Sequence, residues 1–221
     1  MNFAEVTAGL PGAGAAARLG RRARGAFDVD EWGLDPELVG LVDPVLSLRW
    51  SIDVVGAEQL PAVGGAVLVF NRRVGVSEPW VLARGIRLAT GRFVRTVGVP
   101  DVAPVGPVLR RFGGVLDRTD EIAGLLDAGQ LVGLPMARAL RGRRQAGALE
   151  VERLQAAVAT GAPVVPVALL GREAGRSWRV VLGDAVRPGT GGPLDAVELA
   201  DATRRGVQDL LDDAVPPSWW R

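Results

Sequence analysis

The arginines are the residues whose types and positions point to chemistry. Arg72 and Arg73 follow directly after the apolar run AVLVFN at residues 66–71. Arg118 ends the segment FGGVLDR, and Arg138 lies three residues after the apolar run QLVGLP. A guanidinium group stays protonated at any working pH and offers paired N–H donors to phosphate or carboxylate groups. These side chains can therefore bind an anion, but they cannot accept a proton.

The composition removes most other catalytic groups. The 221 residues include no His, Cys or Tyr, which excludes imidazole bases, thiol nucleophiles, disulfides and nearly all transition-metal sites. All 26 basic residues are Arg, and 25 acidic residues leave a net charge of +1, which argues against a general nucleic-acid binder. We therefore expect no metal, no cofactor and no nucleic-acid partner.

Alternating strands and helices are predicted to position the arginines. Short apolar runs at 66–70, 131–135 and 163–171 indicate buried strands, and the alternating run SIDVV indicates an edge strand. Further strands are predicted at 93–99, before Arg118 and at 178–186, and helices at 35–50, 78–90, 120–130, 148–161 and 199–213. The first helix should be kinked or split at Pro44. This order predicts one α/β domain with a mostly parallel or mixed central sheet and helices on both faces.

Composition changes at both ends suggest the domain limits. Residues 1–30 are rich in Gly, Ala and Arg and predict a mobile arm, residues 31–215 the α/β domain, and residues 216–221 a tail with two Trp. Indole rings beside an Arg suit a lipid headgroup region. No run reaches the 18 or so apolar residues of a membrane span, and the N-terminus lacks the features of a secretory signal. We expect a cytoplasmic protein with peripheral contact at the inner face of the membrane.

Four segments, in their order and spacing, carry a resemblance to a known family. They are VVGAEQLPAVGGAVLVFN (54–71), FGGVLDR (112–118), VGLP (132–135) and GAPVVPVALLG (161–171). Together they resemble the glycerolipid acyltransferases of the lysophosphatidic acid acyltransferase type, over about residues 48–190. The resemblance implies an α/β fold that handles an acyl thioester, such as acyl-CoA or an acyl carrier thioester, and a lysophospholipid.

The same resemblance implies that the catalytic groups are missing. In the family, the loop after the first strand of this pattern carries His, four further residues and Asp; aligned on Asn71, these positions are Arg72 and Ser77. The family's Pro-Glu-Gly-Thr reads here Pro135 to Arg138, with Met136 at the Glu position. Because Arg72 cannot act as a general base, we expect no catalytic residue and predict an inactive, lipid-binding relative of the enzymes.

The arginines remain as candidate ligands for an anion. Arg118 matches a family Arg that contacts phosphate, and Arg73 matches a basic residue often found after the His. The predicted site is therefore Arg72, Arg73, Arg118 and Arg138, which would hold the anionic head of an acyl thioester, a lysophospholipid or a similar amphiphile.

Two other functional hypotheses stay open at this point. One is an active acyltransferase without histidine, in which Glu78 or Asp117 is the nearby acid and alignment of the two substrates supplies the acceleration. The other is a regulatory relative that binds an active acyltransferase or another protein through the helix at 35–50 and the Trp tail.

Several of these residues also have an ordinary structural interpretation. Met136 suits core packing, Ser77 suits the cap of a helix with Pro79 in its first turn, and the arginines at 141–144 suit a solvated loop.

Overall fold

One sheet organises the part of the chain that this computed structural model describes, residues 20, 29–72, 76–139, 145–189 and 195–214. Within these residues, seven strands pair in the order β1-β7-β6-β2-β5-β3-β4. The strands are β1 (Ser51–Val55), β2 (Ala66–Arg72), β3 (Val94–Val97), β4 (Gly114–Val115), β5 (Leu131–Arg138), β6 (Val164–Gly171) and β7 (Ser177–Leu182). The helices are α3 (Pro36–Arg49), α4 (Glu78–Thr90), α5 (Val105–Arg111), α6 (Thr119–Asp127), α7 (Gln155–Thr160) and α8 (Asp195–Asp213), with short 3₁₀ helices η2 (Ala57–Gln59) and η3 (Val151–Leu154).

The sheet is mixed and mostly parallel, as predicted. Strands β6, β2, β5, β3 and β4 run parallel to one another, while β7 is antiparallel to β6 and parallel to the edge strand β1. Strand β2 lies between β5 and β6, and residues 66–71 of β2 are buried because helices cover both faces of the sheet there. Its carboxyl end is therefore in the middle of the sheet edge.

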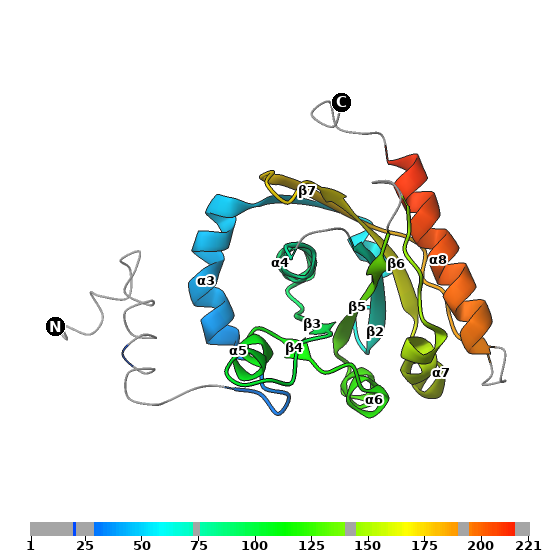
Figure 1. The fold of residues 1–221 in the computed structure, drawn as a ribbon, viewed down its shortest axis with the longest axis horizontal. Coiled ribbons are helices and arrows are strands. Elements are labelled where there is room, and N and C mark those ends of the chain that lie inside the picture. The colour runs from blue at the N-terminus through cyan, green and yellow to red at the C-terminus, as the bar shows by residue number, and fades with distance from the viewer. Residues whose placement is uncertain (1–19, 21–28, 73–75, 140–144, 190–194, 215–221) are drawn as a thin grey trace.

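Two hydrophobic clusters hold the layers together. On one face, Val67 and Val69 of β2 pack with side chains of α6, α7 and α8, including Leu125 and Leu211. On the other face, Leu68 and Phe70 pack against α4, and α3 lies outside α4 (Figure 1). The sheet curls around α4, which confirms helices on both faces.

The helices predicted at 35–50 and 148–161 differ from the observed ones in their course or their start. Helix α3 is continuous through Pro44 rather than split there, and none of its residues is buried. The helix predicted at 148–161 begins only at Val151, as the 3₁₀ turn η3. The preceding residues stay extended because the carbonyl of Ala148 accepts a hydrogen bond from the N–H of Ala137, at the end of β5.

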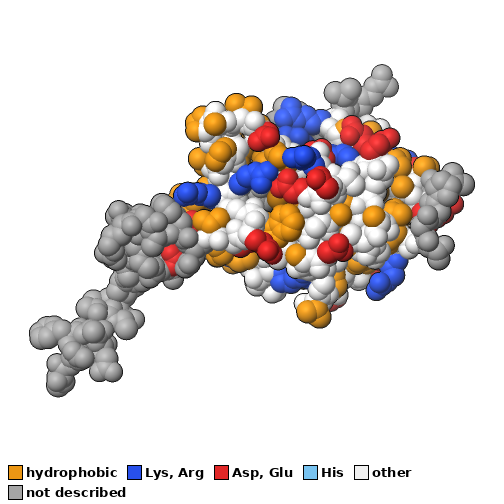
Figure 2. Space-filling view, turned by 90° about the horizontal axis from the view of Figure 1, so that it is seen from below, with side chains coloured by type: hydrophobic (Ala, Val, Ile, Leu, Met, Phe, Trp, Pro, Cys, Tyr) orange, Lys and Arg blue, Asp and Glu red, His pale blue; other side chains and the backbone are white. Residues whose placement is uncertain are grey.

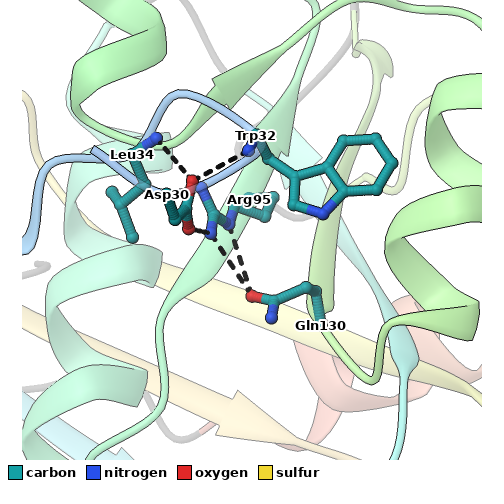
Figure 3. A network of polar contacts seen from close by, with 5 residues as sticks. All are labelled: Asp30, Trp32, Leu34, Arg95 and Gln130. Carbon is teal, nitrogen blue, oxygen red and sulfur yellow. Dashed lines mark hydrogen bonds and ion pairs between the residues drawn. The ribbon is translucent and has the colours of Figure 1, made fainter.

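A buried arginine holds residues 30–34 onto the domain (Figure 3). Arg95 of β3 is 1% exposed, and its guanidinium forms an ion pair with Asp30 and weak hydrogen bonds with Gln130. The same Asp30 carboxylate accepts the N–H groups of Trp32 and Leu34 at 3.0 and 2.9 Å. Asp30, the last residue of the predicted arm, thus takes part in this contact with the domain.

Charges of both signs share the surface shown in Figure 2. Basic side chains lie next to acidic ones, with hydrophobic side chains between them. On the described part of this face, neither charge forms a continuous patch, in keeping with a net charge of +1.

Candidate functional site

The candidate site lies where β2 and β5 end side by side. Arg72 ends β2 and Arg138 ends β5, and the two residues are partners in the parallel register of these strands. Neighbouring strands lie about 4.8 Å apart, so two guanidinium groups start from adjacent points at the carboxyl edge of the sheet. Open α/β sheets bind their ligands at this edge.

Two cavities open beside Arg72. The first has a volume of about 160 Å³ and is mostly apolar, with Trp80, Val97, Leu109 and Phe112 among its lining residues. The second has a volume of about 270 Å³ and is lined mainly by charged groups. Its charged residues are Arg72, Asp117, Arg138, Glu150 and Arg153.

The two cavities are neighbours because they share part of their walls. Arg72, Gly98 and Pro135 line both of them. Arg72 therefore stands at the junction between an apolar space and a charged one. Its Nε atom is buried and makes no hydrogen bond with any residue that the structure describes. Leaving a buried donor unpaired costs about 1–3 kcal/mol, and more for a charged group.

One ion pair builds the wall of the charged cavity. Arg153 of η3 contacts both oxygens of Asp117, at 3.3 and 3.0 Å, and donates to the carbonyl of Pro135 at 2.7 Å. Its side chain is 16% exposed. Arg153 thus joins Asp117, two residues after β4, to Pro135 within β5, and its charge is largely matched by that of Asp117.

The predicted anion ligands do not all meet. Arg72 and Arg138 line the same cavity, as expected from their strand ends. Arg118 lines neither cavity; its side chain is 63% exposed and lies 3.9 Å from the Asp120 carboxylate. Arg73 and the arginines at 141, 143 and 144 lie outside the described residues.

The start of α4 is capped by Glu173, from the turn between β6 and β7. Ser77 is the N-cap residue of α4, as predicted, but its side chain makes no capping hydrogen bond to the helix. Its hydroxyl instead donates to Glu173 Oε1 at 2.7 Å, and the Glu173 carboxylate also accepts the N–H groups of Val76 and Ser77. A carboxylate there stabilises the positive end of the helix dipole. The turn carrying Glu173 is held by Arg49 of α3, which donates to the carbonyls of Glu173 and Gly175.

Met136 is a core residue, as its ordinary interpretation suggested. Its side chain is 2% exposed and packs in the cluster that faces α6, α7 and α8. The acid Glu78, which the sequence placed near the loop, is 1% exposed at the start of α4. Both residues are thus enclosed by protein.

Three residues of this region were missed from sequence. Arg153 and Glu150 come from a segment read as an ordinary helix, and Glu173 from a turn between strands. No motif marks them, because their place depends on which elements pack together. Among the described residues, no group of acidic side chains is arranged to hold a metal ion.

The arrangement of the sheet and its helices is shared with a solved acyltransferase structure. The structure is similar to that of the 1-acyl-sn-glycerophosphate (LPA) acyltransferase PlsC from Thermotoga maritima, with a TM-score of 0.53 and 20% sequence identity. The likeness covers 79% of this chain and 78% of that chain. It confirms the predicted fold class.

In sequence, the chain is similar to uncharacterized mycobacterial proteins. It is 28% identical over 178 residues to one from Mycobacterium leprae and 27% identical to one from Mycobacterium tuberculosis. These alignments cover 70% of this chain and 47% and 48% of the relatives, so the chain spans about half the length of the curated relatives it matches. No protein-family model matches the sequence. Of the helices in the described residues, none is both long and apolar enough to span a membrane.

Proposed function

We propose that this protein binds an amphiphile with an acyl chain and an anionic head, and that it does not transfer the acyl group by base catalysis. The observation that carries the proposal is the position of Arg72 between the apolar and the charged cavity. A ligand that is apolar at one end and anionic at the other fits both spaces at once. Lysophospholipids and acyl thioesters with phosphate groups have this character.

The anionic head is assigned to Arg72 and Arg138. Both can present N–H donors to one phosphate or carboxylate, since they start from paired positions on neighbouring strands. The buried Nε of Arg72 would then gain a partner, which removes the cost of leaving it without one.

The apolar end is assigned to the smaller cavity. Its volume of about 160 Å³ is close to that of an engineered cavity of about 150 Å³ that takes up benzene. The cavity thus holds a short stretch of an acyl chain, and a longer chain would continue outside it. Trp80 and Phe112, which stack edge to face at 5.3 Å, form part of its wall.

Base catalysis is disfavoured by the groups available. The chain has no His, and a guanidinium group does not serve as a general base. Of the two acids that the sequence placed near the loop, Asp117 is engaged by Arg153 and Glu78 is enclosed at the start of α4. Loss of a general base costs about a hundred- to ten-thousand-fold in rate.

The test is equilibrium binding of a fluorescent lysophospholipid and of acyl-CoA, together with thiol release from acyl-CoA measured with a thiol dye. The protein contributes no background to the dye because it contains no Cys. We expect saturable binding and no thiol release. Arg72→Gln should weaken binding about tenfold or more, as expected when a charged hydrogen bond is lost.

Arg118→Gln is the matched control, because Arg118 is exposed and lines neither cavity. Equal losses in the two variants would contradict the assignment of the head group. Thiol release by the native protein that depends on a lysophospholipid would contradict the proposed inactivity.

A further inference from the structure

In the charged cavity, one acid is engaged by no basic group of the described residues. Asp117 is matched by Arg153, at 3.0 Å. Glu150 also lines the cavity, and its carboxylate forms no ion pair or hydrogen bond with any residue that the structure describes. Within the part of the chain that the structure describes, the cavity thus presents two cations without an ion-pair partner, Arg72 and Arg138, together with one such anion, Glu150.

The position of Glu150 is fixed by its neighbours. It directly precedes η3, and its carbonyl accepts the N–H of Arg153, whose side chain is bonded to Pro135 and Asp117. Gly147, three residues earlier, packs so closely on Ala137 that an added Cβ would lie 1.7 Å from the Ala137 carbonyl oxygen. The segment carrying Glu150 is therefore held against the end of β5.

We propose that Glu150 is a specificity-determining residue that selects ligands whose head group carries an ammonium next to the phosphate. The phosphate would be bound by Arg72 and Arg138, and the ammonium by the Glu150 carboxylate. A head group with a phosphate alone would offer the Glu150 carboxylate no positive partner. This inference rests on the proposed function, because it assigns the head group of the same amphiphile.

The expected size of the preference for an ammonium follows from the exposure of the charged side chains to water. Glu150 and Arg138 are exposed, so water screens the charges around them. An exposed ion pair contributes about 0.2–1 kcal/mol, which corresponds to a factor of up to about five in affinity. A preference of about two- to fivefold is the expected result.

The experiment compares two lysophospholipids that differ only in the ammonium. They are a lysophosphatidylethanolamine and a lysophosphatidylethanol with the same short acyl chain, each used below its critical micelle concentration. Free phosphoethanolamine, without a chain, is the third ligand. Affinities are measured for the native protein, Glu150→Gln and Glu152→Gln; Glu152 is an exposed acid that lines neither cavity and is the matched control.

The native protein should bind the ethanolamine lipid about two- to fivefold more tightly than the ethanol lipid. Glu150→Gln should remove this preference, and Glu152→Gln should keep it. A preference that is absent in the native protein, or unchanged in Glu150→Gln, would overturn the role of Glu150 while leaving the proposed function intact.

The other two outcomes concern the amphiphile itself. No binding of either lipid to the native protein would overturn both proposals. Binding of free phosphoethanolamine as tight as that of the ethanolamine lipid, and dependent on Glu150, would support the head-group selection and contradict the proposed role of the apolar cavity.

Discussion

Asp30 and Arg95 form one ion pair, but replacing Asp30 should destabilise the protein more than replacing Arg95. Asp30→Asn keeps a side-chain oxygen for the N–H groups of Trp32 and Leu34 but removes the charge opposite Arg95. Arg95 is 1% exposed, and its other side-chain partner in the described structure, Gln130, lies 3.4–3.5 Å away. The substitution therefore leaves a buried guanidinium without a carboxylate.

Removing one partner of a buried ion pair costs about 3–5 kcal/mol. We take the lower end, about 3 kcal/mol, because the side chain of Asp30 is 34% exposed and water already screens part of the interaction. In a chain of 221 residues this corresponds to a fall in Tm of about 6–12 °C. Arg95→Met removes the buried charge itself, and the Asp30 carboxylate that remains can be hydrated, so the cost should be only about 1 kcal/mol.

The assay is denaturant unfolding of the native protein and the two variants, followed by two spectroscopic probes to check two-state behaviour. Asp53→Asn is the control for a surface pair, since Asp53 and Arg179 lie 2.9 Å apart but are 58% and 49% exposed. It should cost less than about 1 kcal/mol. If Arg95→Met destabilises the protein as much as Asp30→Asn, the burial argument is wrong.

Three further substitutions test the surroundings of the site by denaturant unfolding. Met136→Glu should cost about 3 kcal/mol or more, because Met136 is 2% exposed. The loss should shrink as the pH falls and be smallest well below about 4.3, where the introduced carboxyl is neutral in both the folded and the unfolded state; a loss independent of pH would contradict this. Gly147→Ala should lower the free energy of unfolding by about 2 kcal/mol or more, because the added Cβ would lie 1.7 Å from the Ala137 carbonyl oxygen. It should also weaken lysophospholipid binding. Unchanged stability would show that the segment around Gly147 moves freely. Glu173→Gln should lower the free energy of unfolding by about 0.3–1 kcal/mol, because it weakens the cap of α4. An unchanged free energy of unfolding would show that the start of α4 needs no carboxylate.

The sequence predicts the strands better than the helix ends. Continuous apolar runs identify β2, β5 and β6, because a strand covered on both faces has no polar side chain to interrupt it. The start of the helix at 148–161 was misplaced because the pairing of Ala148 with Ala137 joins segments whose contact no local pattern encodes.

The site was predicted only where strand ends define it. Arg72 and Arg138 could be placed together because the ends of parallel strands meet at one sheet edge. Arg153 reaches the same cavity from a 3₁₀ turn, and Arg95 is buried although its neighbours give no sign of it. Both positions depend on partners far along the chain, Asp117 and Asp30, which spacing alone cannot supply.

The pairing of β1 with β7 has a consequence for synthesis on the ribosome. Partners such as Asp53 and Arg179 are 126 residues apart. At about 5–20 residues per second, β1 must wait for about 6–25 seconds before its partner strand has been made. During this interval the nascent chain carries an alternating apolar strand with an unpaired edge, which other strands can join. The first strand of the sheet is thus among the last to be secured, and chaperones have their longest opportunity to act there.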